Sequence, residues 1–99
     1  MIPEGAARIE ICNGSGKKGL GASEKGFIES KGYYVSFIST YTGENTQKTR
    51  IIYGSDQFAD DAQALMQYYD SVEVINDRKM LSTGTDIRII LGTDMNEAS

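Results

Sequence analysis

The sequence contains no histidine, which removes the side chain most often used as a general base and the commonest protein ligand of zinc. Cys12 is the single cysteine, so no disulfide can form within the chain. It lies in the apolar stretch "IEIC", where we expect a buried strand thiol without a reactive role. Catalysis would depend on carboxylates, lysine or tyrosine, and the sequence shows no cluster of them. We expect no enzymatic activity, no metal site and no cofactor.

Long apolar runs and an excess of positive charge are also missing. No run approaches the length of a membrane span and no signal peptide is recognisable, so we expect no membrane insertion by this segment. Ten Lys and Arg residues face fourteen Asp and Glu residues, for a net charge of -4. Affinity for phosphate backbones needs clustered positive charge, so we expect no nucleic-acid partner.

The remaining composition is that of one ordinary globular domain. Ninety-nine residues, 39% of them hydrophobic, can form one modest core but are too few for the two halves of a full dinucleotide-binding sheet. We expect the domain to span residues 8–94. Residues 1–7 would form a flexible lead-in and residues 95–99 a polar tail.

Apolar periodicity predicts an α/β fold, of the α+β type with two or three layers, in the order β-α-β-β-α-β-β. The elements would form a single mixed β-sheet with two helices, and the apolar last strand would lie at its centre. The predicted strands span 8–13, 33–40, 49–54, 71–77 and 86–94; the helices span 20–31 and a segment beginning at 57 or 58.

The helices differ in the quality of their apolar stripes. The first has a weak stripe of Leu20, Ser23 and Phe27, with Ile28 beside them and two interior glycines. The second has a better one, formed by Phe58, Ala62, Leu65 and Tyr69. The two halves of the chain echo each other in element order, which we interpret as common topology because no residues match between them. The acidic residues that flank the last strand, Asp86 and Asp94, could hold a cation or a sugar hydroxyl, but we expect them to be solvated.

The turn after the first strand carries glycines in the spacing G-x-G-x-x-G, at Gly14, Gly16 and Gly19. A dinucleotide site also needs an acidic residue at the end of the second strand, and residues 38–41 provide none. A phosphate-binding loop would need glycine where Ile11 stands. Nucleotide binding through the Gly14–Gly19 turn is therefore the least favoured interpretation.

The same turn is nevertheless the best candidate for a binding site. Asn13 and Gly14 would turn the chain sharply, and the Asn13 side chain would support the turn. Backbone N–H groups at a helix start beside two lysines favour an anionic group. The candidate residues are Asn13, Gly14, Ser15, Gly16, Lys17 and Lys18.

Several stretches, in this order, resemble the LytR C-terminal domain family. They are "RIEICNGSGKKGLG", "KGYYV" after the first helix, "TRIIYG" before the second helix and "DIRIILGTD" at the end. The resemblance extends from about Arg8 to Asp94. Gly21 stands where the family usually has alanine, which agrees with a weak first helix.

The resemblance implies an extracytoplasmic, accessory domain of the bacterial cell envelope, cut from a longer membrane-anchored or secreted protein. Such domains often follow a LytR-CpsA-Psr catalytic domain, which attaches glycopolymers to peptidoglycan. The partner would be an anionic cell-wall polymer or a peptidoglycan component. The alternative is a structural module that pairs with a neighbouring domain or another envelope protein through a sheet edge.

Overall fold

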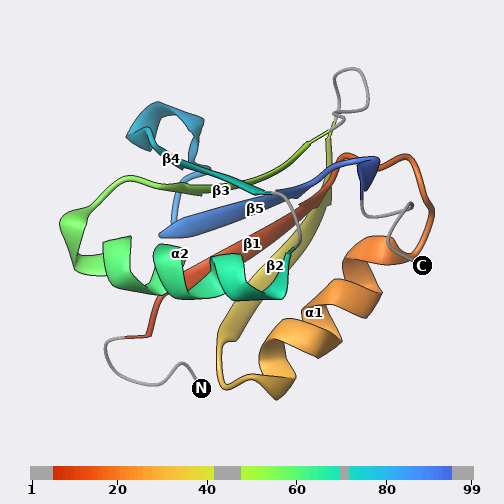
Figure 1. Cartoon of the computed structure of the whole chain (residues 1–99), viewed down its shortest axis with the longest axis horizontal. Helices are drawn as coiled ribbons and strands as arrows, with labels where there is room; N and C mark the ends of the chain where they lie inside the picture. The colour runs from red at the N-terminus through yellow and green to blue at the C-terminus, as the bar shows by residue number, and fades with distance from the viewer. Residues whose placement is uncertain (1–5, 42–47, 70–71, 95–99) are drawn as a thin grey trace.

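The computed structural model describes residues 6–41, 48–69 and 72–94 and confirms the predicted order of elements (Figure 1). The strands are β1 (Arg8–Asn13), β2 (Tyr34–Thr40), β3 (Thr49–Tyr53), β4 (Val72–Asn76) and β5 (Ile87–Leu91), and the helices are α1 (Leu20–Ser30) and α2 (Ala59–Leu65). Short 3-10 turns span Asp56–Phe58, Met66–Tyr68 and Arg78–Met80. The expected polar tail and residues 1–5 of the expected lead-in lie outside the described residues.

The five strands form the single mixed sheet that the sequence predicts, and the structure gives their order as β2-β1-β5-β3-β4. β1 runs parallel to both β2 and β5, whereas β3 is parallel to β4 and antiparallel to β5. The apolar last strand is therefore central. Its alternate residues Ile87, Ile89 and Leu91 are fully buried against the helices.

Two β-α-β units of similar construction lie on either side of β5. In the first, the N–H of Tyr41 donates to the carbonyl of Asn13, 3.0 Å away; in the second, the N–H of Asp77 donates to the carbonyl of Tyr53 at 2.9 Å. Because the units run in opposite directions and their helices cover the same face of the sheet, an approximate two-fold rotation about the sheet normal relates them (Figure 1). The turn from strand to helix therefore occurs at opposite ends of the sheet.

The helices bury their apolar residues against the same sheet face. The stripe predicted for the second helix is confirmed, because Phe58, Ala62, Leu65 and Tyr69 are all buried. Phe58 lies in the 3-10 turn before α2 and Tyr69 follows the 3-10 turn after it, so the stripe extends beyond the α-helix itself.

The stripe predicted for the first helix is only partly right: Ile28 is buried and Leu20 packs against the core, but Ser23 and Phe27 are exposed. The residues buried on α1 are Gly21, Glu24 and Ile28, whereas Phe27 is 39% exposed. The cause is a close approach: a Cβ atom on Gly21 would lie 2.7 Å from Cγ2 of Ile38 on β2. The glycine that weakens this helix in isolation is thus what lets it pack on the sheet.

Neither α1 nor α2 covers the opposite face of the sheet, which carries a smaller apolar cluster. Cys12, Ile52 and Ile90 are buried there, so the expectation of a buried strand thiol is confirmed. Their cover comes from partly buried side chains around the sheet: Tyr41, Ile75, Met80 and Leu81.

A charged residue is buried on this same face. Glu10 is 1% exposed and lies between the neighbouring strands β2 and β5. Its Oε2 accepts a hydrogen bond from the Ser39 hydroxyl at 2.5 Å and lies 3.3 Å from Nε of Arg88. The Arg88 guanidinium also donates to the carbonyl of Met80 at 3.1 Å, which ties the 3-10 turn before β5 to the sheet.

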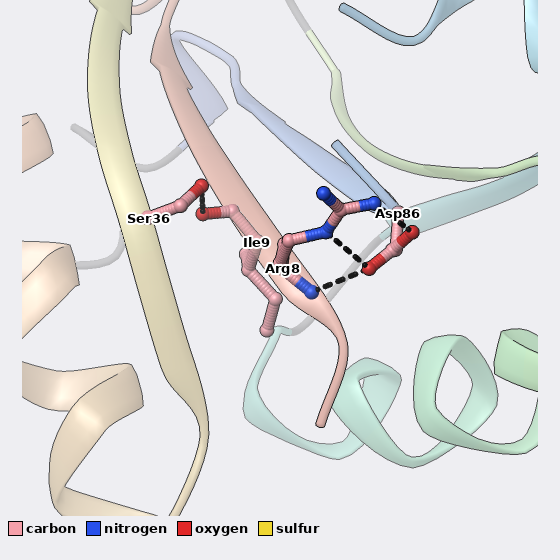
Figure 2. A network of polar contacts seen from close by, with 4 residues as sticks. All are labelled: Arg8, Ile9, Ser36 and Asp86. Carbon is pink, nitrogen blue, oxygen red and sulfur yellow. Dashed lines mark hydrogen bonds and ion pairs between the residues drawn. The ribbon is translucent and has the colours of Figure 1, made fainter. Parts of the chain in front are cut away.

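The acidic residues at the ends of the last strand are bonded to the chain rather than simply solvated. Asp94 Oδ1 accepts the Thr49 hydroxyl at 2.6 Å and its Oδ2 accepts the Thr49 N–H at 3.1 Å. Asp86 Oδ2 accepts the backbone N–H of Arg8 at 2.9 Å and its Nε at 3.1 Å (Figure 2). The two carboxylates thus attach the ends of β5 to the starts of β3 and β1, a pairing across 45 and 78 positions that local patterns do not reveal.

Asp86 makes stability depend on pH. Burial alone would raise its pKa, but the hydrogen bonds and the charge of Arg8 outweigh burial and lower the pKa. Folding favours the ionised form of Asp86, so the carboxylate stabilises the folded protein. This stabilisation is complete above the pKa of the unfolded chain, about 3.9, and is lost as the pH falls through the lower pKa of the folded protein. We expect Asp86→Asn to lower the urea midpoint at pH 7. The difference in urea midpoint between Asp86→Asn and the wild type should become smaller below about pH 4. A difference that stays constant with pH would contradict this account.

Candidate functional site

The turn after β1 is held by side-chain hydrogen bonds within five residues. Asn13 Nδ2 donates to the carbonyl of Lys17 at 2.8 Å, and Asn13 Oδ1 accepts the Ser15 N–H at 3.1 Å and the Ser15 hydroxyl at 2.6 Å. Ser15 Oγ in turn accepts the N–H of Lys17 at 3.1 Å. The interpretation of Asn13 as the residue that supports the turn is confirmed.

The six candidate residues divide into two groups. Asn13, Gly14 and Ser15 build the turn: Gly14 donates its N–H to the carbonyl of Leu91 at 2.9 Å, and Ser15 is 3% exposed. Gly16, Lys17 and Lys18 are exposed, with Gly16 at a φ of 79°. The turn therefore presents two lysines on a locally fixed backbone.

Helix α1 begins directly after these lysines. Gly19 occupies the N-cap position at a φ of 88°, and no side chain caps the helix there. Its carbonyl accepts the N–H of Ser23 at 3.2 Å. Because the N-terminus of a helix carries a partial positive charge, it adds to the positive potential of the lysines.

A hollow of about 280 Å³ lies beside the turn, and we call it the turn hollow. It is lined by Asn13, Gly16, Lys17, Lys18, Gly19, Thr40 and Tyr41. Thr40 and Tyr41 reach it because β2 pairs in parallel with β1, so both strands end at this edge. The described lining residues include two cations and no carboxylate, which suits an anionic group.

The turn hollow also bears on nucleotide binding. The end of β2, where a dinucleotide site places its acidic residue, contributes Thr40 and Tyr41 to the lining. Lysines and backbone amides could contact a phosphate, but no described lining residue could accept the ribose hydroxyls through a carboxylate. Nucleotide binding stays the least supported alternative.

A second hollow of about 350 Å³ lies at the other end of the sheet, and Asp86 is the lining residue that the sequence offers as a minor ligand candidate. It is lined by Gly54, Ser55, Phe58, Arg78, Leu81, Ser82, Thr83, Thr85 and Asp86. These residues come after the ends of β3 and β4, just as the residues of the turn hollow lie at and after the ends of β1 and β2. The two halves of the sequence share the same order of elements, and this similarity could have indicated an equivalent hollow in the second half. Because no residues match between the halves, the sequence alone did not reveal it.

The wall of the second hollow depends on a close approach at Gly54. A Cβ atom there would lie 2.8 Å from Cα of Arg78 and 3.0 Å from Cδ1 of Leu81. The absence of a side chain brings the 3-10 turn Arg78–Met80 against the end of β3. Arg78 then donates from Nη2 to the Gly54 carbonyl at 3.3 Å.

The described residues provide neither a metal-ligand cluster nor a membrane span. Among them, no group of three or more His, Cys, Asp or Glu side chains could hold a metal ion. No helix among them has the length and apolarity needed to cross a bilayer.

Comparison with known proteins identifies a family. The family model described as "LytR cell envelope-related transcriptional attenuator" matches residues 6–94, nearly the whole chain. Neither the curated proteins nor the solved structures gave a match.

Proposed function

Because the chain belongs to the LytR C-terminal domain family, whose members are accessory domains of cell-envelope proteins, we propose that it is a binding module without catalytic activity. It acts outside the cytoplasm, as a domain of residues 8–94 within a longer membrane-anchored or secreted protein. Its ligand is an anionic cell-wall glycopolymer or an anionic component of peptidoglycan, held at the turn hollow.

The observation that supports this proposal is the composition of the turn hollow. Lys17 and Lys18 are exposed on a turn whose backbone is fixed by the Asn13 and Ser15 side chains. The start of α1 adds its partial positive charge, and Tyr41 offers a half-buried ring that could contact a sugar. A fixed loop loses little conformational freedom when a ligand binds, so shallow contacts can suffice.

Exposed charge contacts are weak one at a time. An ion pair between solvated groups contributes about 0.2 to 1 kcal/mol. A polymer with repeating anionic units offers many equivalent sites at high local density, so a domain that dissociates from one unit can rebind at a neighbouring one. We therefore expect weak binding to a single repeat unit and measurable retention on the intact wall.

Co-sedimentation with peptidoglycan sacculi tests the proposal. We expect the domain to sediment with sacculi that carry anionic glycopolymer and to be released as salt screens the charges. Binding that is lost with stripped sacculi would assign the ligand to the glycopolymer, and binding that persists would assign it to the peptidoglycan itself. Lys17→Ala/Lys18→Ala should reduce the bound fraction at least about threefold, which corresponds to loss of two contacts of about 0.3 to 0.5 kcal/mol each.

The matched control is Lys25→Ala/Lys31→Ala, which removes two lysines at other positions along α1 and its C-terminal end. Lys25 pairs with Glu29 at 3.6 Å, and Lys31 lies over the rings of Phe27 and Tyr68. This variant has the same net charge as the test variant and should bind like the wild type. Equal losses in both variants would show that net charge, and not the turn, governs retention.

A second candidate function is supported by the edge strand β2. Its sequence "YVSFIST" contains no charged residue, and Phe37 and Ile38 are 39% and 40% exposed. Edge strands without charges are suited to pairing with a strand of another protein. If the domain stays in the supernatant with every type of sacculus, the polymer proposal fails and β2 becomes the surface on which to seek an envelope protein.

A further inference from the structure

The second hollow combines hydrogen-bonding groups of several kinds in a small space. Ser55 comes from the turn after β3, Arg78 from the turn after β4, and Ser82, Thr83, Thr85 and Asp86 from the segment before β5. Phe58 and Leu81 supply apolar lining between them. Its volume of about 350 Å³ is near the lower end of the range of about 300 to 1,000 Å³ typical of small-molecule sites.

Thr85 is the residue of this hollow whose polar group is unsatisfied. The residue is 7% exposed, and its Oγ1 has no hydrogen-bond partner in the part of the chain that the structure describes. Its backbone is fixed, since the N–H donates to the carbonyl of Ser82 at 3.0 Å. A buried hydroxyl without a partner costs free energy in the unliganded protein. The Thr85 Oγ1 atom itself is almost inaccessible, so a ligand in the hollow regains that cost by drawing the side chain toward it.

The charged groups of the hollow balance each other. The Arg78 guanidinium donates two long hydrogen bonds to the Gly54 carbonyl, at 3.3 and 3.4 Å, and other N–H groups of its fork remain for a ligand. Asp86 is ionised and bonded to Arg8, yet a carboxylate has about four lone-pair positions, and Arg8 fills three of them. An anion would meet the charge of Asp86 and a cation that of Arg78.

We propose that the second hollow binds a single neutral sugar ring. Sugar hydroxyls both donate and accept, so one ring can donate to Asp86 and accept from Arg78. It can also pair with the Thr85 hydroxyl, while its C–H face lies against Phe58. The site lies at the opposite end of the sheet from the turn hollow and does not depend on it.

Amide chemical-shift titration with N-acetylglucosamine tests this proposal on the whole chain. We expect saturable shifts at residues 54–55 and 82–86 at millimolar sugar, with residues 13–19 unchanged. Thr85→Val keeps the shape and removes the unsatisfied hydroxyl, so it should raise the thermal midpoint while weakening sugar binding about three- to tenfold. A purely structural residue would not give opposite changes in stability and affinity.

Two controls make the result specific. Thr40→Val makes the same chemical change at the turn hollow, and Lys17→Ala/Lys18→Ala removes the charges of that hollow; both should bind the sugar like the wild type. Sodium sulfate should leave residues 82–86 unshifted. The proposal is overturned if the sugar shifts no amide of this hollow, if Thr85→Val binds it as tightly as the wild type, or if sulfate competes for the same amides.

Discussion

Glu10→Ala is expected to lower the free energy of unfolding by about 2 to 4 kcal/mol. Without this carboxylate, the Arg88 guanidinium remains in the sheet face with no opposite charge, and its side chain is only 21% exposed. Breaking a fully buried pair costs about 3 to 5 kcal/mol, and the partial exposure of Arg88 reduces that range. Urea unfolding followed by far-ultraviolet circular dichroism measures the difference.

The pair is not itself a strong source of stability, because Oε1 of Glu10 has no partner among the described residues. Replacing both members with apolar residues of similar size removes two charges and the unsatisfied oxygen. We therefore expect Glu10→Leu/Arg88→Met to be at least as stable as Glu10→Ala and to approach the wild type. A double variant whose loss equals the sum of the losses of Glu10→Leu alone and Arg88→Met alone would show that the charges do not interact.

Tyr69→Phe is expected to lower the free energy of unfolding by about 1 to 3 kcal/mol. The Tyr69 hydroxyl donates to Oε2 of Glu24 at 2.7 Å, and each residue is 9% exposed. Burial, followed by the charge and hydrogen bond of Glu24, raises the pKa of Tyr69 well above its usual range, so the hydroxyl remains a donor. Its loss leaves the Glu24 carboxylate buried between the helices without this bond.

Two companion variants separate this bond from the loss of a tyrosine. Tyr68→Phe changes the neighbouring ring, which is only partly buried and packs edge-on against Phe27, and should alter stability by less than about 0.5 kcal/mol. Tyr69→Phe/Glu24→Met removes the stranded carboxylate as well and should recover most of the loss. If Tyr69→Phe alone unfolds at the wild-type urea concentration, the hydroxyl contributes nothing to the attachment of α1 to the segment after α2.

The elements and their order could be predicted because alternation and helical spacing report directly which side chains face a core. The buried face of α1 could not be predicted, because it depends on how closely Gly21 approaches Ile38, a contact between separate elements. The same limit applies to Asp86 and Asp94. Their partners, Arg8 and Thr49, become neighbours only when β5 takes its central place in the sheet.

The two hollows differ in the same way. The turn hollow was predictable in outline because its lysines, turn amides and helix start are contiguous in the chain, although Tyr41 joins them only through strand pairing. The second hollow combines residues 54–58 with residues 78–86, and no spacing motif connects those segments. Topology alone places them together, through the equivalence of the two β-α-β units.

The central position of β5 beside β1 has a mechanical consequence. These two strands are the first and last of the described domain, they are parallel neighbours, and they are paired from Ile9 with Ile87 to Asn13 with Leu91. Tension applied at the two ends of the domain would act along both strands in opposite directions. The hydrogen bonds between them would then bear the load together in shear instead of opening one after another. The topology therefore suits a domain that holds its shape while it is pulled.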